Sequence, residues 1–188
     1  MNLNAHYALN KTLAGTHSFL APSSPAWVNY DEDKLARVFF TAQRARRGAE
    51  EHALAHDLIR LRIKLPDTPK TLNLYVNDAI GYKMTSEVLL YYSDNCYGHA
   101  DCVCFRDNTL RIHDLKTGSR DASMAQLEIY SALFCLEYNF RPSDIKIELR
   151  IYQNDAVKVY NPEPDPIYHI MDKIRTWDKR INELKQED

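Results

Sequence analysis

The amino-acid sequence predicts an α/β domain in which a helical N-terminal part is followed by a sheet and a closing helix. The 188 residues fall within the usual size of one domain, and 45% hydrophobic with 27% charged residues can form an ordinary core. Helix formers dominate before Gly81, and short runs of β-formers follow it. We therefore expect a single domain over residues 1–188, with a helical part at about 24–80, a sheet and helix at about 84–160 and a C-terminal helix at about 164–186.

The helical part is expected to begin at a proline-containing turn. Ser23 or Ser24 precedes Pro25, and proline is favoured in the first position of a helix after such a cap. Gly48 is the single breaker in the long stretch that follows, which favours one long helix or two helices joined near residues 46–48. In order, we expect helix at 33–61, a proline-flanked turn at 66–70 and helix at 71–80.

The β-rich part contains runs of β-branched and aromatic residues separated by polar connections. The short connection from Arg106 to Asn108 suits a hairpin between two of the runs. We found no internal repeat. The expected elements are strands at 85–92, 99–105 and 109–115, a helix at 122–138, strands at 145–152 and 156–160, and a helix at 164–186.

Composition limits the class of protein. No apolar run approaches the length of a membrane span, and the first residues lack the basic and apolar regions of a secretory signal, so we expect a cytoplasmic protein without a membrane partner. Four cysteines without repeated C-x-x-C spacing favour reduced thiols. The net charge of -2 does not indicate a strongly basic nucleic-acid binder, but residues 34–64 carry a surplus of five positive charges. That surplus suits phosphate contacts or a solvated helix face equally well.

The expected strand at 109–115 ends in a charged pair. Alternation places Leu110, Ile112, Asp114 and Lys116 on one side, so burial of the apolar pair draws the charged pair towards the interior. An isolated buried charge is costly unless it is paired or binds a metal. This Asp-x-Lys pair therefore indicates the edge of a site.

The preceding strand offers a second carboxylate at Asp101. If the two strands pair through the hairpin, Asp101 and Asp114 come close together. Adjacent carboxylates repel each other, and a hard divalent cation such as Mg²⁺ removes that penalty. Such a cation can activate water at a phosphodiester, while Lys116 orients the water or stabilises the transition state.

Further residues join Asp101 and Asp114 in a series of short motifs on successive helices and strands. Twelve residues separate Asp101 from Asp114, and the last members fall on the helix after the strand. In chain order the set is Gly48-x-x-x-His52, Gly98-x-x-Asp101, Asp114-x-Lys116-Thr117-Gly118 and Gln126-x-x-x-Tyr130.

This set resembles the motifs of the RecB-like nucleases, a branch of the PD-(D/E)XK superfamily. The resemblance extends over about residues 20 to 140 and includes the Pro-Ser-Ser segment before Trp27. It implies a restriction-endonuclease-like core, a mixed β-sheet flanked by helices. It also implies Mg²⁺ or Mn²⁺ as cofactor, with His52, Asp101, Asp114 and the main-chain carbonyl of Leu115 as ligands. Lys116 would be catalytic, and Gln126 and Tyr130 would support the site or contact substrate.

Several other residues have side chains suited to the same roles. Glu50 or Glu51 could replace His52 as a ligand, although a solvated helix face is the better interpretation of both. His52 and His56 have the spacing of a zinc pair but lack a third ligand. Pro66-Asp67 lies in a turn-like context and does not suit the site, and packing is expected for His99 and His113. The cysteines depart from the pattern of relatives that carry an iron–sulfur cluster, so we expect none.

The resemblance implies hydrolysis of DNA, with exonuclease action in recombination, repair or phage DNA processing, in a bacterial or phage-infected cytosol. A structure-specific endonuclease and a catalytically inactive nucleic-acid-binding or assembly module on the same fold are the alternatives. Two acids facing one lysine argue against the inactive module. A short chain has little room for a substrate clamp, which favours a homo-oligomer or a helicase or recombinase partner.

Overall fold

The computed structural model describes residue 13 and residues 15–187. The chain divides into two compact units, Met1–Arg46 and Arg47–Asp188, and one long helix, α2 (Glu32–Arg60), crosses the boundary. In the first unit the Trp27 indole donates a hydrogen bond to the Ala21 carbonyl at 3.0 Å, and the rings of Phe19 and Phe39 meet edge to face at 5.5 Å. All motif residues lie in the second unit.

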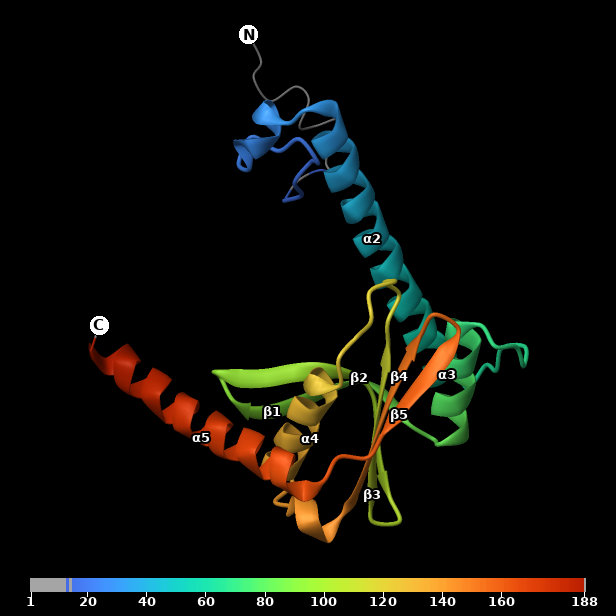
Figure 1. Ribbon diagram of the computed structural model, residues 1–188, viewed down its shortest axis with the longest axis vertical. Coiled ribbons are helices and arrows are strands. Elements are labelled where there is room, and N and C mark those ends of the chain that lie inside the picture. The colour runs from blue at the N-terminus through green and yellow to red at the C-terminus, as the bar shows by residue number, and fades with distance from the viewer. Residues whose placement is uncertain (1–12, 14, 188) are drawn as a thin grey trace. The chain divides into compact units, whose positions relative to one another are not determined.

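The elements follow the predicted order. A 3₁₀ helix, η2 (Pro25–Asn29), precedes α2, and the later elements are α3 (Thr71–Gly81), β1 (Thr85–Ser93), β2 (Cys96–Arg106), β3 (Thr109–Leu115), α4 (Ala125–Glu137), η3 (Pro142–Asp144), β4 (Lys146–Gln153), β5 (Ala156–Tyr160) and α5 (Pro164–Glu187) (Figure 1).

The start of the helical part differs from the prediction. Pro25 opens only the short 3₁₀ helix, and the side chain of Ser24 makes no capping hydrogen bond. The α-helix begins later, where the Asp31 Oδ1 accepts a hydrogen bond from the Lys34 amide at 2.7 Å. An aspartate in that position satisfies an amide that the first helical turn leaves unpaired. From there α2 continues through Gly48 as one helix.

The five strands form one mixed sheet in the order β1-β2-β3-β4-β5. The first three are antiparallel, β3 and β4 are parallel, and β5 is antiparallel to β4. Parallel neighbours need a long crossover, which α4 supplies between β3 and β4. Two-residue turns with positive φ at both positions close the β2–β3 and β4–β5 hairpins. The prediction of a mixed sheet flanked by helices is therefore confirmed.

Helices cover both faces of the sheet (Figure 1). Helices α4 and α5 bury one face, where Leu127 and Ile167 pack with Leu110, Ile112 and Leu149. Helix α3 and the last turns of α2 bury the other face. There Ala55, Ile59, Tyr75 and Val76 pack with Cys102, Leu115 and Tyr152. No helix in the described part of the chain has the length and apolar character needed to cross a membrane.

Candidate active site

Asp101 and Asp114 lie on neighbouring strands, β2 and β3. Cys102 pairs with His113, so the register places the two aspartates opposite each other one step further along. The Asp101 Oδ2 accepts a hydrogen bond from the Leu115 amide at 2.8 Å. Asp114 is buried, with only 3% of its surface exposed. The structure thus brings together the two carboxylates that the sequence suggested.

Lys116 follows β3 directly and faces the same site. Its Nζ lies 3.0 Å from Asp114 Oδ2 and 3.1 Å from Oδ1. Its amide donates to the carbonyl of Tyr152 on β4 at 2.9 Å, which continues the parallel pairing and fixes the backbone. The ammonium also donates a 2.9 Å hydrogen bond to the Gln126 Oε1 on α4. Lys116 therefore links Asp114 to α4.

Gln126 and Tyr130 continue this chain of contacts along α4. Their positions one turn apart allow the Gln126 Nε2 to donate to the Tyr130 hydroxyl at 3.2 Å. The hydroxyl in turn donates to the carbonyl of His99 on β2 at 2.6 Å. A Cβ on Gly98 would lie 2.9 Å from the Tyr130 ring, so the ring can reach this position only because residue 98 is glycine. Tyr130 thus anchors α4 to the strand that carries Asp101.

His52 reaches the site from α2. Its Nδ1 lies 3.4 Å from Asp101 Oδ2. One turn earlier, a Cβ on Gly48 would lie 2.6 Å from the Thr117 Oγ1, so the missing side chain lets the segment after Lys116 approach the helix. Gly48 thus leaves room for another motif to approach α2.

The other weighed residues lie elsewhere. His56 is engaged with the Ser86 Oγ at 2.9 Å, whereas His52 contacts Asp101. Glu50 and Glu51 are exposed on α2, and Asp67 is exposed between α2 and α3. His99 is exposed and His113 is fully buried. All four cysteines are free.

The electrostatics of the site follow from crowding of negative charge. The pKa of Asp114 is raised to about 6, first by burial and then by the charge of Asp101, against the opposing effect of Lys116. Contact with Asp101 raises the pKa of His52, and the charges of Asp114 and Glu87 add to this effect. A proton or a metal cation near these carboxylates would relieve their repulsion.

A divalent cation at this site would need several oxygen or nitrogen ligands directed at one point. In the described part of the chain, no group of three or more His, Cys, Asp or Glu side chains is already arranged to hold a metal ion. Instead, the Leu115 amide and His52 engage Asp101, and Lys116 engages Asp114. However, the buried Asp114 Oδ2 accepts no hydrogen bond, because Lys116 approaches it without hydrogen-bond geometry. Two neighbouring carboxylates, one with a buried oxygen that accepts no hydrogen bond, fit Mg²⁺ or Mn²⁺, which prefer oxygen ligands.

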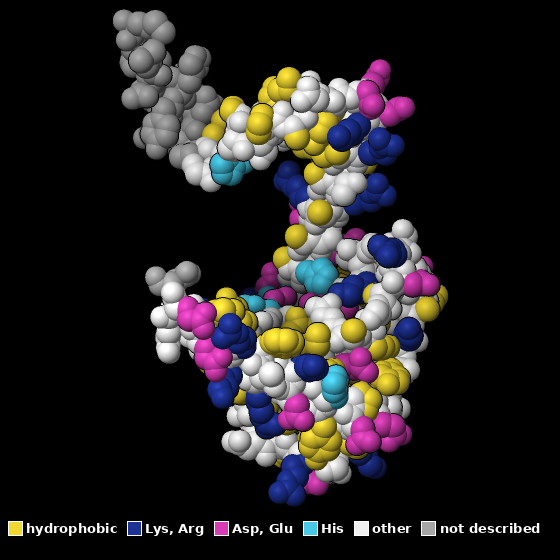
Figure 2. Space-filling model, turned by 60° about the vertical axis from the view of Figure 1, so that its left-hand side comes forward, with side chains coloured by type: hydrophobic (Ala, Val, Ile, Leu, Met, Phe, Trp, Pro, Cys, Tyr) yellow, Lys and Arg dark blue, Asp and Glu magenta, His cyan; other side chains and the backbone are white. Residues whose placement is uncertain are grey.

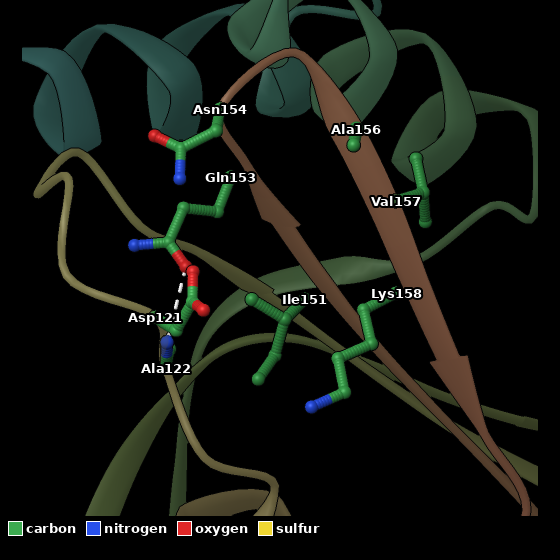
Figure 3. A pocket seen from close by; sticks show the side chains of 8 residues that line it. All are labelled: Asp121, Ala122, Ile151, Gln153, Asn154, Ala156, Val157 and Lys158. Atoms are coloured by element: carbon green, nitrogen blue, oxygen red, sulfur yellow. Dashed lines mark hydrogen bonds between the residues drawn. The ribbon is translucent and has the colours of Figure 1, made fainter.

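Gln153 is a residue near the site that the sequence did not single out. From the end of β4 its Nε2 donates to the carbonyls of Gly118 and Arg120, and its Oε1 accepts from the Ala122 amide at 3.1 Å. It thereby holds the segment between Lys116 and α4. Figure 3 shows Gln153 pointing towards this segment at the edge of a cavity of about 320 Å³. No motif residue lines that cavity.

No family model, curated protein or solved structure matches this chain. The functional argument therefore depends on the motif residues and on the contacts among them.

Proposed function

We propose that this chain is a divalent-metal-dependent nuclease of the RecB-like branch of the PD-(D/E)XK superfamily. On this proposal the mixed sheet is a restriction-endonuclease-like core, and the reaction is hydrolysis of phosphodiester bonds in DNA, by exonuclease action. The order of helix, three antiparallel strands, crossover helix and parallel strand supports this interpretation of the fold.

One observation carries the proposal: four short motifs spread over residues 48 to 130 meet at one place. Two glycines lie directly against residues of other motifs: Gly48 against Thr117, and Gly98 against Tyr130. At each glycine a Cβ atom would come closer than 3.0 Å to the neighbouring side chain. A chance match of residue types would not require these two glycines to lie against other motifs. The convergence supports a site built from the whole set.

The proposed chemistry divides among these residues. Asp101, Asp114, the carbonyl of Leu115 and His52 would hold Mg²⁺ or Mn²⁺, which when bound lowers the pKa of water and neutralises charge on the phosphate. The Lys116 ammonium would stabilise negative charge on the phosphate or orient the attacking water. Gln126 would hold this ammonium in place through its Oε1, and Tyr130 would hold Gln126.

The charges on the surface are compatible with binding of DNA at local basic groups rather than over the whole surface. On the face seen in Figure 2, Lys and Arg side chains are interspersed with Asp and Glu. This mixture agrees with the net charge of -2. Binding would then depend on local basic groups and the metal site more than on the field of the whole molecule.

The proposal is tested by incubating the purified protein with linear and with closed-circular DNA in Mg²⁺ or Mn²⁺. We expect degradation of linear DNA from its ends and no change in the circles. Nicking of the circles would replace exonuclease with endonuclease action. An absence of product with both substrates and both metals, for a folded protein, would overturn the nuclease proposal and favour the inactive binding module.

A further inference from the structure

The hairpin of β1 and β2 has one face that helices cover and one that they leave open. On the covered face Leu90 and Ala100 are buried under α4. The residues that alternate with them along each strand point to the opposite face. Helix α3 lies against β3, β4 and β5, and on this opposite face of the hairpin the side chains are exposed. This open face consists of Leu89 and Tyr91 of β1 and Tyr97 and His99 of β2.

The open face presents two tyrosine rings side by side. Tyr91 and Tyr97 are cross-strand partners whose ring centroids lie 6.3 Å apart, with an angle of 26° between the ring planes. Tyr91 is 43% exposed and Tyr97 is 58% exposed. The Tyr91 hydroxyl donates a 2.8 Å hydrogen bond to Asp94 Oδ1, which holds that ring in place. Leu89 and His99 form the next pair along the hairpin. Contiguous exposed apolar groups of this kind mark interaction surfaces.

The open face leads to the candidate site. Tyr97, His99 and Asp101 follow one another at every second position of β2, so they share one side of the strand. Asp101 contacts His52 of α2, and the last turns of α2 pack on the side of the sheet away from α4. At about 3.4 Å per residue, His99 lies on the order of 7 Å and Tyr97 on the order of 13 Å along the strand from Asp101. The rings and the carboxylate therefore belong to one continuous surface.

A single strand of nucleic acid has the chemistry that this surface suits. Proteins that hold single strands stack successive bases on aromatic side chains, because every base has a π-face. The bases of a duplex are stacked on one another, whereas unpaired bases can be splayed onto such rings. Tyrosine suits an exposed platform since its ring is apolar while its hydroxyl can stay in water. The neighbouring carboxylates, on the proposed function, act on the phosphodiester bonds of DNA.

We propose that Tyr91, Tyr97 and His99 form a base-stacking platform that holds a single strand of DNA where it enters the candidate site. The inference rests on the proposed function, because it names the form of DNA that the nuclease takes. The substrate class is single-stranded DNA, including the single-stranded overhang of a duplex. These are positioning residues that act on bases away from the reacting phosphate. Tyr97 contributes most, since it is the more exposed ring and shares its strand with Asp101.

The test measures binding without cleavage, in the full chain with EDTA present. The probes are fluorescent oligo(dT) and an abasic strand of the same length, which has the phosphates but no bases. Wild type should bind oligo(dT) more tightly than the abasic strand. Tyr97→Leu should weaken binding of oligo(dT) by roughly five- to a hundredfold and leave the abasic strand unaffected, whereas Tyr97→Phe keeps the ring and should bind as wild type does. Tyr160→Leu, at an exposed tyrosine of the opposite edge strand β5, is the matched control and should change neither affinity.

The outcomes separate this inference from the proposed function. Equal binding of the two probes by wild type, or an unchanged preference for oligo(dT) in Tyr97→Leu, would overturn the platform. Tyr91→Leu repeats the measurement at the paired ring, and the Tm of each variant shows that it is folded. A wild-type dimer that separates in Tyr97→Leu during sedimentation would assign the open face to a second copy and also overturn the platform. Cleavage of linear DNA in Mg²⁺ is measured separately, so cleavage without a preference for bases leaves the nuclease standing, and a preference without cleavage leaves only the platform.

Discussion

At the scale of single residues, the candidate site depends on a buried carboxylate beside a lysine. Asp114 and Lys116 are held by each other, and Lys116 is held again by Gln126. Asp114 nevertheless has a buried oxygen that accepts no hydrogen bond and a raised pKa, which is a poor arrangement for stability alone. Strongly perturbed ionisable groups with a specific charged partner are typical of functional sites.

We predict that Lys116→Ala and Asp114→Asn each reduce DNA cleavage by about a hundredfold or more while the protein stays folded. Each change removes one electrostatic contact to the reacting groups and little core volume. Cleavage rates and Tm should be measured together, with Lys179→Ala on an exposed part of α5 as the control. A well-folded Lys116→Ala protein with near-normal turnover would refute the assignment of this site.

The two histidines on α2 are expected to behave differently. His52 contacts Asp101, whereas His56 bonds to Ser86. We predict that His52→Ala weakens Mn²⁺ binding roughly tenfold or more and that His56→Ala leaves it unchanged, because only His52 reaches the carboxylates. Calorimetric titration of both variants tests this. Equal losses, together with zinc in the purified protein, would favour a histidine metal pair.

At the scale of elements, α4 is tied to the sheet by the chain of contacts from Lys116 through Gln126 and Tyr130 to the His99 carbonyl. We predict that Gln126→Ala and Tyr130→Phe slow cleavage roughly tenfold to a hundredfold, the range for partners that orient reactive groups. Both side chains are partly exposed or exposed, so Tm and metal affinity should change much less. A fall in Tm with unchanged specific activity would show that they serve helix packing alone.

The close approach of Tyr130 to Gly98 gives a separate prediction. In Gly98→Ala the new Cβ would lie 2.9 Å from the Tyr130 ring, so the ring must move and its hydrogen bond to His99 must lengthen or break. We expect Gly98→Ala to reduce activity in the wild-type background and to add little in a Tyr130→Ala background. Gly81→Ala is the matched control, since nothing lies within 4 Å of a Cβ there. Additive effects in the double variant would exclude this mechanism.

The elements were predictable to different degrees. Alternation and turn residues predicted the strands and the polar hairpin, because both follow from local chemistry. The start of α4 was predicted at residue 122 but occurs at Ala125. Gln153 holds Gly118, Arg120 and Ala122 in an irregular segment, and this long-range contact leaves no local pattern. The change of face across Asp101 was not predictable either, because regular alternation would put Ala100 and Cys102 on one face, whereas Ala100 packs under α4 and Cys102 packs under α3.

At the scale of the whole molecule, motif order predicted that these residues come together, but not which residues lie against the motif glycines Gly48 and Gly98. Gly48 and Gly98 are explained only by neighbours 69 and 32 positions away in the chain, Thr117 and Tyr130. The polar contacts on the face of the sheet under α3 were not predicted either. There Asp78 of α3 accepts hydrogen bonds from Tyr152 and Arg150 of β4, a polar network that apolar patterning does not indicate.

This network contains the buried residue His113. The Tyr152 hydroxyl donates to Asp78, so at its 3.1 Å contact with His113 it accepts from the Nδ1–H. The Nε2 is then an unprotonated nitrogen, and it is buried without a partner. Burial, followed by the positive charges of Arg150 and Arg111, lowers the pKa of His113 to about 3. The ring of Tyr82 also packs edge to face on the His113 imidazole.

Global stability should therefore depend on pH through His113. Its pKa is lower in the folded chain than the ordinary value of 6.5, so the unfolded chain binds the proton more tightly. The stabilisation is complete above pH 6.5 and is lost as the pH falls towards 3. Between pH 7 and pH 5 this corresponds to about 2 kcal/mol in the free energy of unfolding.

The prediction is tested by urea unfolding of wild type and His113→Asn at pH 7 and pH 5. Asparagine retains an N–H donor for Tyr152 but does not titrate, so the variant should lose about 2 kcal/mol less than wild type on acidification. Other groups that titrate in this range, Asp114 among them, are present in both proteins and cancel in the comparison. Equal losses in the two proteins would mean that His113 already carries a proton in the fold at pH 5, and the neutral buried imidazole would have to be abandoned.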